Sequence, residues 1–370
     1  MNRRDRNNSG FTQKDVLKSA ASRYRRRRLS RAGVAVILCV VLFIGVFAAS
    51  IWHITKRVAK EAAEALKKEE TTLFAEEEKT PPKEYFDKIT VDNGEKVKGD
   101  LILVNYQYPY TFPENEDHIV KVFDKKNSNY GVAYGNERLE GRIVEILNDL
   151  TDTFYEKTGD KCILVRSAYR SLADQQSIYD SYLQSNGEQY VKEYVATPGQ
   201  SEHHTGIAFD LNIRLNDGTY VAVKDYEHLR ELNSVMISYG FVQRYTEAKY
   251  PITLIKNEPW HYRYVGIPHS YVMTKEHYCL EEYVEYVKAY SADGEMLYVN
   301  EAGEILTCTK DAIAEKGYLI YYVPVSEGTS TEVKLPKGAE NYTVSGNNVD
   351  GFIVTVTLGE VVLPEVVTLP

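Results

Sequence analysis

Cysteine is scarce in this chain, and its spacing gives no thiolate metal site. Only four cysteines occur among 370 residues, and no two of them have the C-x-x-C spacing of such sites. Cys39 lies in a long apolar run, which leaves Cys162, Cys279 and Cys308 outside it. The sequence is compatible with a Cys279–Cys308 disulfide or with unpaired thiols. So few cysteines indicate a fold that does not depend on disulfide bonds.

An excess of positive charge is confined to the amino terminus, and acidic residues outnumber basic ones in the rest of the chain. The first 31 residues hold 11 Lys and Arg, including RYRRRR at 23–28, and only two acidic residues. Because the whole chain has a net charge of −9, the part that follows this +9 leader carries a net charge of −18. Such an acidic surface argues against nucleic acid as a partner.

An uncharged run of 21 residues follows the basic leader, over residues 32–52. It is long enough to cross a bilayer as a helix. The positive-inside rule then predicts a cytoplasmic tail over 1–31, a transmembrane helix over 32–54 and an extracytoplasmic remainder. The small residues AAS at 48–50 leave a cleaved signal peptide as the alternative. The run is long for such a peptide, so we expect a single-pass anchor in the cell membrane.

Composition divides the remaining chain into three parts. Residues 55–97 are a charged stalk and linker, whose Ala-, Glu- and Lys-rich first part predicts a helix that ends at the proline pair 81–82. A larger domain over 98–290 begins with a predicted strand at 101–106. Short β-branched runs divided by Gly, Pro and Asn predict a small β-rich module over 291–370.

Helical and strand patterns alternate within the larger domain. Apolar residues at steps of three and four predict an amphipathic helix over 137–157 that ends at Gly159. Ser171 opens a capping-box-like start for a helix to about residue 185. The remaining expected elements are a strand at 162–169, a helix at about 224–239, and strands at 241–245 and 258–265.

The segment SEHHTGIAFDLNI at 201–213 contains a candidate functional residue in a strand. Ile207, Phe209, Leu211 and Ile213 alternate on one face, which leaves Asp210 on the other. A carboxylate in such apolar surroundings needs a partner, because an unpaired buried charge is costly. Either a metal ion or an arginine such as Arg170 would satisfy it.

A second stretch, NEPWHYRYVG, holds the other histidine whose setting suggests a ligand. His203, Asp210 and His261 would form the three-ligand set of a catalytic zinc site, with one coordination position open. Glu258 would then be the base that takes a proton from the attacking water. Strand alternation separates Glu258 from His261, so we expect a bend at Pro259 or a later strand start. Three further histidines of this region, His228, His269 and His277, are expected at the surface.

Three ordered motifs resemble one family, the zinc D-alanyl-D-alanine carboxypeptidases of the VanY type. This family belongs to a metallopeptidase group that includes lysostaphin, the D-Ala-D-Ala peptidases and sonic hedgehog. The family patterns S-x-H-x-x-G-x-A-x-D, E-x-W-H and S-x-Y-R-S all occur here, over roughly residues 98–290. They are carried by Ser201, His203, Gly206, Ala208 and Asp210, by Glu258, Trp260 and His261, and by Ser167, Tyr169, Arg170 and Ser171.

The resemblance implies a fold and a role for each matched residue. The fold is α+β, with helices packed on a mainly antiparallel sheet and zinc at its open face. The implied zinc ligands are His203, Asp210 and His261, and the pattern selects His203 over His204, which strand alternation places on the opposite side. Glu258 is the implied general base and then acid. Arg170 is implied to stabilise the substrate carboxylate or the oxyanion, Gln175 and Ser201 to bind the terminal D-residue, and Trp260 to form a cleft wall.

The resemblance and the predicted topology together imply an extracytoplasmic zinc carboxypeptidase that removes D-alanine from peptidoglycan stem peptides. A dipeptidase acting on free D-Ala-D-Ala would be expected in the cytoplasm, so the topology disfavours it. Two alternatives stay open at this point. One is an L,D-carboxypeptidase of tetrapeptide stems, and the other is a zinc-containing module that binds wall peptides without turnover. Glu258 argues against the module, because binding alone needs no base.

Overall fold

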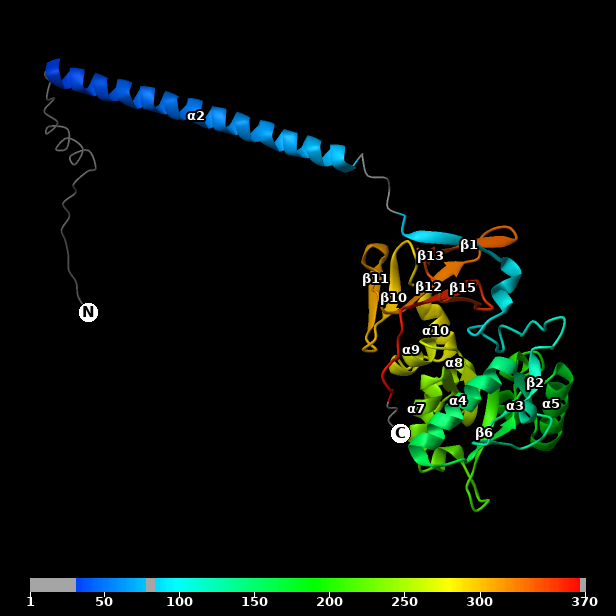
Figure 1. Ribbon diagram of the computed structural model, residues 1–370. Helices are drawn as coiled ribbons and strands as arrows, with labels where there is room; N and C mark the ends of the chain where they lie inside the picture. Colours follow the sequence, from blue (N-terminus) through cyan, green and yellow to red (C-terminus); the bar gives the residue numbers. More distant parts are fainter. Residues whose placement is uncertain (1–30, 78–83, 367–370) are drawn as a thin grey trace, which may run out of the picture. The chain divides into compact units, whose positions relative to one another are not determined.

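The structure is a computed structural model that describes residues 31–77 and 84–366. It divides into two units, residues 1–83 and 84–370 (Figure 1). The predicted basic tail, residues 1–31, lies outside the described residues except for Arg31. The proline pair and the last four residues of the predicted β module also lie outside the described residues.

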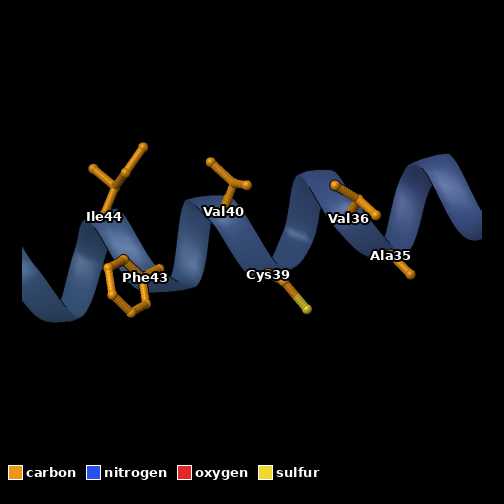
Figure 2. A pocket seen from close by; sticks show the side chains of 6 residues that line it. All are labelled: Ala35, Val36, Cys39, Val40, Phe43 and Ile44. Carbon is orange, nitrogen blue, oxygen red and sulfur yellow. The ribbon is translucent and has the colours of Figure 1, made fainter.

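The first unit contains one long helix, α2 (Arg31–Glu77), which joins the predicted membrane span and stalk without a break. Its apolar side chains point outward and are exposed, as Figure 2 shows for one stretch: Ala35, Val36, Cys39, Val40, Phe43 and Ile44. Among the described helices, α2 is long and apolar enough over residues Gly33–Lys68 to cross a membrane. A helix that is apolar on all sides requires an apolar environment.

A six-stranded sheet organises the region that holds the three motifs. Its strand order is β3-β5-β6-β9-β8, with the short β7 paired to β6, and every pair except β3–β5 is antiparallel. The strands are β3 (Gly131–Val132), β5 (Ile163–Ser167), β6 (Ala208–Arg214), β7 (Tyr220–Val221), β8 (Phe241–Tyr245) and β9 (Glu258–Tyr264). The predicted mixed α+β fold with mainly antiparallel strands is confirmed.

Helices α4 and α7 share the main apolar core with the sheet. Leu147 of α4 and Leu232 of α7 are fully buried with Phe209 and Leu211 of β6, so this face of the sheet is closed to solvent. The helices of the second unit are α3 (Val122–Lys125), α4 (Gly141–Thr158), α5 (Leu172–Asn186), α6 (Glu188–Tyr194), α7 (Leu229–Ser238), α8 (Tyr250–Thr253), α9 (His269–Lys275) and α10 (Leu280–Val287). A two-stranded ladder, β2 (Ile119–Lys121) with β4 (Arg138–Glu140), precedes α4.

Local signals in the sequence correctly predict where α4 ends and where α5 begins. Helix α4 ends at Gly159, whose φ of 77° is the left-handed conformation that glycine adopts without strain. Helix α5 begins after Ser171, whose side chain accepts from the Asp174 amide while the Asp174 carboxylate accepts from the Ser171 amide. Helix α4 starts at Gly141, four residues later than predicted, because Arg138–Glu140 pairs as strand β4 instead.

The predicted strand at 101–106 is wrong. Residues 101–105 are buried, as their largely apolar composition requires, and Tyr106 is exposed, but no strand pairs with the segment. Its backbone polar groups find other partners. The Arg263 guanidinium donates to the carbonyls of Asp100 and Ile102, and the Leu101 amide donates to the Ser345 hydroxyl. An apolar run therefore marks burial here without specifying a strand.

The carboxyl-terminal region forms an antiparallel five-stranded sheet of order β11-β10-β12-β15-β14. A separate ladder pairs β13 with β1, which lies near the start of the second unit. The strands are β1 (Phe86–Asp92), β10 (Glu295–Val299), β11 (Ile305–Thr309), β12 (Gly317–Pro324), β13 (Ser330–Pro336), β14 (Tyr342–Gly346) and β15 (Gly351–Leu358). Residues of this sheet share a core with α9, α10 and the segment at 101–104. The domain boundaries at 97/98 and 290/291 stay predictions.

Two further details concern cysteine and histidine. All four cysteines are free, so Cys279 and Cys308 are not bridged. The expectation that His269 lies at the surface is wrong. It opens α9 in a buried position, where Nδ1 lies 2.7 Å from the Tyr283 hydroxyl and Nε2 lies 2.9 Å from the Thr355 hydroxyl. The imidazole thus joins α9 to α10 and β15.

The burial of His269 predicts an acid sensitivity of folding. Burial lowers its pKa to about 3, whereas the unfolded chain binds the proton near pH 6.5. The unfolded state therefore holds more protons below pH 6.5, and stability falls as the pH drops from there towards 3. We expect His269→Gln to weaken this loss by up to about 1.4 kcal/mol per pH unit. Urea unfolding of the full chain at a series of pH values measures it, and parallel profiles for both proteins would contradict it.

Candidate metal centre and active-site cleft

A cleft of about 560 Å³ opens on the face of the sheet opposite to the main core. Strands β5, β6, β8 and β9 form its floor, and α5 and α6 contribute to its wall. It holds every residue that the sequence singled out for chemistry or substrate binding. These are Arg170, Gln175, Ser201, His203, Asp210, Glu258, Trp260 and His261.

Asp210 reaches this cleft because β6 alternates as predicted. Phe209 and Leu211 are fully buried on the core side, which turns Asp210 to the other face. Its side chain is only 14% exposed. Although burial disfavours the charged form, His203, His261 and Arg170 lie close enough to hold the pKa of Asp210 well below its usual range. The carboxylate is therefore ionised and fully engaged.

His203 lies on a short 3-10 helix (Glu202–Thr205) just before β6. The helix ends at Gly206, which has a φ of 73° and so allows the chain to turn into the strand. The His203 Nδ1 lies 2.7 Å from the carbonyl of Ala168 and donates its hydrogen to it. Its other nitrogen, Nε2, faces the Asp210 Oδ1 at 3.4 Å.

His261 comes to the same point from the neighbouring strand. In the antiparallel pair β6–β9 it stands directly opposite Asp210, and its Nδ1 lies 3.1 Å from Asp210 Oδ1. The rings of His203 and His261 meet edge to face, with their centroids 4.9 Å apart. His261 is buried, and its Nε2 points away from the cluster towards Glu202.

The three side chains offer a donor set that fits zinc. One ligand atom from each of His203, Asp210 and His261 lies within 4.8 Å of the others. In a tetrahedral site with bonds of about 2.0 Å, two ligand atoms are about 3.3 Å apart, close to the spacings between Asp210 and each imidazole. Each imidazole also has its outer nitrogen occupied, as metal-binding histidines usually do. The assignment of these residues as ligands stays a prediction.

Glu258 and His261 both face the cleft because the β8–β9 ladder is irregular. Tyr245 pairs with Glu258 and Gln243 pairs with Tyr262, so two steps along β8 correspond to four along β9. The additional residues break the alternation and resolve the conflict seen in the sequence. Glu258 Oε2 lies 3.8 Å from His261 Nδ1. Burial, opposed by His261, raises the pKa of Glu258, as expected for a base that must also release its proton.

Arg170 is the cation that the sequence offered as the alternative partner of Asp210. Its Nη2 donates to Asp210 Oδ2 at 3.0 Å and to the Ser167 hydroxyl at 2.9 Å. Its Nη1 donates to the side-chain oxygen of Gln175 at 3.2 Å. Gln175 is 1% exposed and donates in turn to the Ala196 carbonyl. Asp210 therefore has the arginine partner at Oδ2, while its Oδ1 faces the two imidazoles.

Comparison with known proteins agrees with this geometry. The sequence profile described as VanY, D-alanyl-D-alanine carboxypeptidase, matches residues 136–267. A D-alanyl-D-alanine carboxypeptidase of Enterococcus faecium is 30% identical over 282 residues, which cover 73% of this chain and 79% of that protein. The chain belongs to the VanY family of D-alanyl-D-alanine carboxypeptidases.

Two other relatives match this VanY-family chain. The bifunctional D-Ala-D-Ala dipeptidase and carboxypeptidase VanXYC of Enterococcus gallinarum is 38% identical over 134 residues, 35% of this chain and 69% of that protein. Among solved structures, the vancomycin-resistance D,D-dipeptidase VanXYg, in complex with a D-Ala-D-Ala phosphinate analogue, has a TM-score of 0.61 and 33% identity. That match covers 74% of this chain and all of the VanXYg chain.

Ser201 and Trp260 differ in how they line the cleft. Ser201 is buried at the start of the 3-10 helix, and its hydroxyl makes no hydrogen bond to any described residue. Its carbonyl accepts from the His204 amide. Trp260 is 37% exposed and belongs to the cleft wall. A hydroxyl that lines the cleft without a protein partner is available to a ligand, whereas the indole offers mainly apolar area.

His204 points away from the cluster, but for a different reason from the one predicted. It lies on the 3-10 helix rather than on a strand, so alternation does not separate it from His203. Its Nδ1 donates to the Arg170 carbonyl at 2.7 Å, and its Nε2 accepts from the Gly199 amide at 3.1 Å. Both ring nitrogens are therefore occupied by the backbone, and Phe112 packs against the ring.

Glu202 is a residue of this VanY-family cleft that the sequence patterns do not single out. Its carboxylate is completely buried and accepts from Arg244 Nε at 2.8 Å and Arg263 Nη1 at 2.9 Å. Glu281 binds the other side of the Arg244 guanidinium. Arginine in the middle of the strands FVQRY and EPWHYRYV was the available signal, because a buried arginine requires a buried anion.

Replacement of the two adjacent histidines separates their roles. We expect His203→Ala to lower zinc affinity by more than the roughly 10–100-fold typical of residues that only hydrogen-bond a ligand. His204→Ala should retain zinc and lose about 1–3 kcal/mol of stability, because the Gly199 amide and the Arg170 carbonyl lose their partners. Zinc titration and thermal unfolding of both variants measure this. Equal zinc loss in the two variants would contradict the ligand assignment.

Proposed function

We propose that the chain is a membrane-anchored, extracytoplasmic zinc carboxypeptidase that removes the terminal D-alanine from peptidoglycan stem peptides. The single observation that carries the proposal is the convergence of His203, Asp210 and His261 beside Glu258 and Arg170 in one cleft. The D-Ala-D-Ala compounds named for its relatives support the substrate class.

The zinc ligands in this proposal are His203 through Nε2, Asp210 through Oδ1 and His261 through Nδ1, the atoms that face one another. Zinc bound there would supply Lewis acidity, which polarises a carbonyl group and makes a water molecule more acidic. Three protein ligands leave one position open for substrate and water, as catalytic zinc sites require.

Glu258 is the proposed proton carrier. It lies in the cleft beside His261, and its raised pKa lets it accept a proton from the attacking water and pass it to the leaving amine of D-alanine. Carboxylates with ordinary pKa values release a proton readily but accept one poorly at neutral pH. Burial of Glu258 therefore suits both halves of the reaction.

Arg170 is the proposed electrostatic group. Ser167, Gln175 and Asp210 hold its guanidinium in one orientation, so little reorganisation is needed as negative charge develops on the scissile carbonyl oxygen. Gln175 acts by orienting Arg170, because its side-chain oxygen accepts from Arg170 and its NH₂ group donates to the Ala196 carbonyl. The free hydroxyl of Ser201 is the proposed contact to the terminal D-residue, and Trp260 the proposed wall of the peptide site.

The proposed location rests on the apolar helix and the charge that precedes it. Residues Gly33–Lys68 can cross a membrane by length and composition, and the basic leader favours a cytoplasmic amino terminus. The cleft would then face the wall, where stem peptides are found. In this layout 1–31 is the tail, 32–54 the membrane helix, 55–97 the stalk, 98–290 the peptidase domain and 291–370 the β module.

The activity test uses the purified full chain in detergent micelles with pentapeptide and tetrapeptide stems. We expect loss of one D-alanine from the pentapeptide, measured by mass spectrometry, and no product after treatment with a chelator. Glu258→Gln should lower kcat by about 10²–10⁴-fold while zinc content stays unchanged, because a positioned base is lost and no ligand is.

The other outcomes of this test correspond to the two alternatives. Turnover of the tetrapeptide alone would replace the D,D activity with an L,D-carboxypeptidase activity. Tight binding of the stems without any product would instead indicate a wall-peptide-binding module. Full activity of the chelated protein would overturn the role of zinc.

A further inference from the structure

Glu202 holds an unusual position next to the predicted metal cluster. It is adjacent in sequence to His203, yet its carboxylate lies beyond His261, with Oε2 3.4 Å from His261 Nε2. Both side chains are buried, with exposed fractions of 0% for Glu202 and 3% for His261. Glu202 therefore contacts the imidazole from the side opposite to Asp210, and the ring is held between two carboxylates.

Glu202 is held by two cations. Its Oε1 accepts from two buried guanidinium groups, Arg244 at 2.8 Å and Arg263 at 2.9 Å, which balance the charge of the buried carboxylate. Arg263 is anchored further by the carbonyls of Asp100 and Ile102. Because each contact fixes the next, the Oε2 atom has little freedom to leave the imidazole.

Glu202 gives His261 an acceptor for the hydrogen on Nε2. Each ring nitrogen of His261 faces a carboxylate, and a carboxylate only accepts hydrogen bonds. When a metal ion takes Nδ1, that nitrogen carries no hydrogen, and the neutral imidazole keeps its hydrogen on Nε2, where Glu202 accepts it. Nδ1 is the atom that faces Asp210 Oδ1 and the cluster. His203 achieves the mirror arrangement through the neutral carbonyl of Ala168, so a carboxylate orients only one of the two imidazoles.

We propose that Glu202 is a positioning residue that presents Nδ1 of His261 to the metal, and that the arginine pair Arg244–Arg263 holds it there. This inference rests on the proposed zinc site. Residues that hydrogen-bond a metal-binding histidine typically contribute about 10–100-fold in metal affinity, because they fix the tautomer and raise the basicity of the ligand.

The test compares Glu202→Gln with a matched control, Glu281→Gln, in the full chain in detergent. The glutamine amide would keep its oxygen on the two arginines and turn its NH₂ group towards Nε2, which favours the wrong tautomer of His261. Glu281 binds the same Arg244 guanidinium but has no contact with His261. Zinc affinity is measured by competition with a chromophoric chelator, and the ligand field by the visible spectrum of the cobalt-substituted protein.

We expect Glu202→Gln to bind zinc about 10–100-fold more weakly and to shift the cobalt bands. Glu281→Gln should bind zinc within about twofold of the wild-type affinity, since it leaves the contact to His261 in place. Wild-type zinc affinity in Glu202→Gln, or an equal loss in both variants, would overturn the inference. A wild-type chain that binds no zinc would instead defeat the proposed function, so the two failures are distinguishable.

A measurement on the unaltered chain covers the case in which Glu202→Gln does not fold. With ¹⁵N-labelled histidine, the zinc-loaded wild type should show His261 with a hydrogen on Nε2 and none on Nδ1. The signal is assigned in the wild-type protein from correlations between the His261 ring and its own backbone, because replacing a proposed ligand would also disturb the zinc-bound state. A hydrogen on Nδ1 of His261 in the loaded protein would overturn the inference without any Glu202 variant.

Discussion

The arrangement of the cleft depends on one largely buried carboxylate in the middle of a strand, Asp210. Asp210 lies between the buried residues Phe209 and Leu211 on β6, and its side chain is 14% exposed in the cleft. Ionisation in such a place requires partners on every side, and they come from different parts of the chain: Arg170 from the turn before α5, His203 from the 3-10 helix and His261 from β9. These partners line the cleft together with Asp210.

Irregularities in the sheet bring several of these groups to the same face. Between Val165 and Ser167 the β5–β6 register shifts by one residue, and this places Ser167 in the cleft, where its hydroxyl accepts from Arg170. The larger shift between β8 and β9 does the same for Glu258. With regular alternation Ser167 would face the core like Val165, and Glu258 and His261 would lie on opposite faces of the sheet. The bulges are therefore part of the site.

The sequence predicted much of the fold and the groups that meet in the cleft, and its failures have physical causes. Alternation around Asp210 and the caps at Gly159 and Ser171 are local signals, and the structure follows them. The expected strand at 101–106 and the expected surface position of His269 are wrong, because contacts with distant parts of the chain determine both. Glu202 was not predicted because the arginines that bind it lie more than 40 residues away in the sequence, and no local pattern connects them.

The pairing of β1 with β13 limits how far the chain can be truncated from its amino terminus. Ile89 and Val91 of β1 lie opposite Val333 and Thr331 and cover part of the small apolar core around Leu335. A fragment beginning at residue 98, where the composition first becomes that of a globular domain, would lack this strand. Strand β13 would then present free backbone groups beside an uncovered apolar patch, a surface prone to edge-to-edge aggregation. The amino-terminal limit of a fragment that keeps this core covered therefore lies before Phe86.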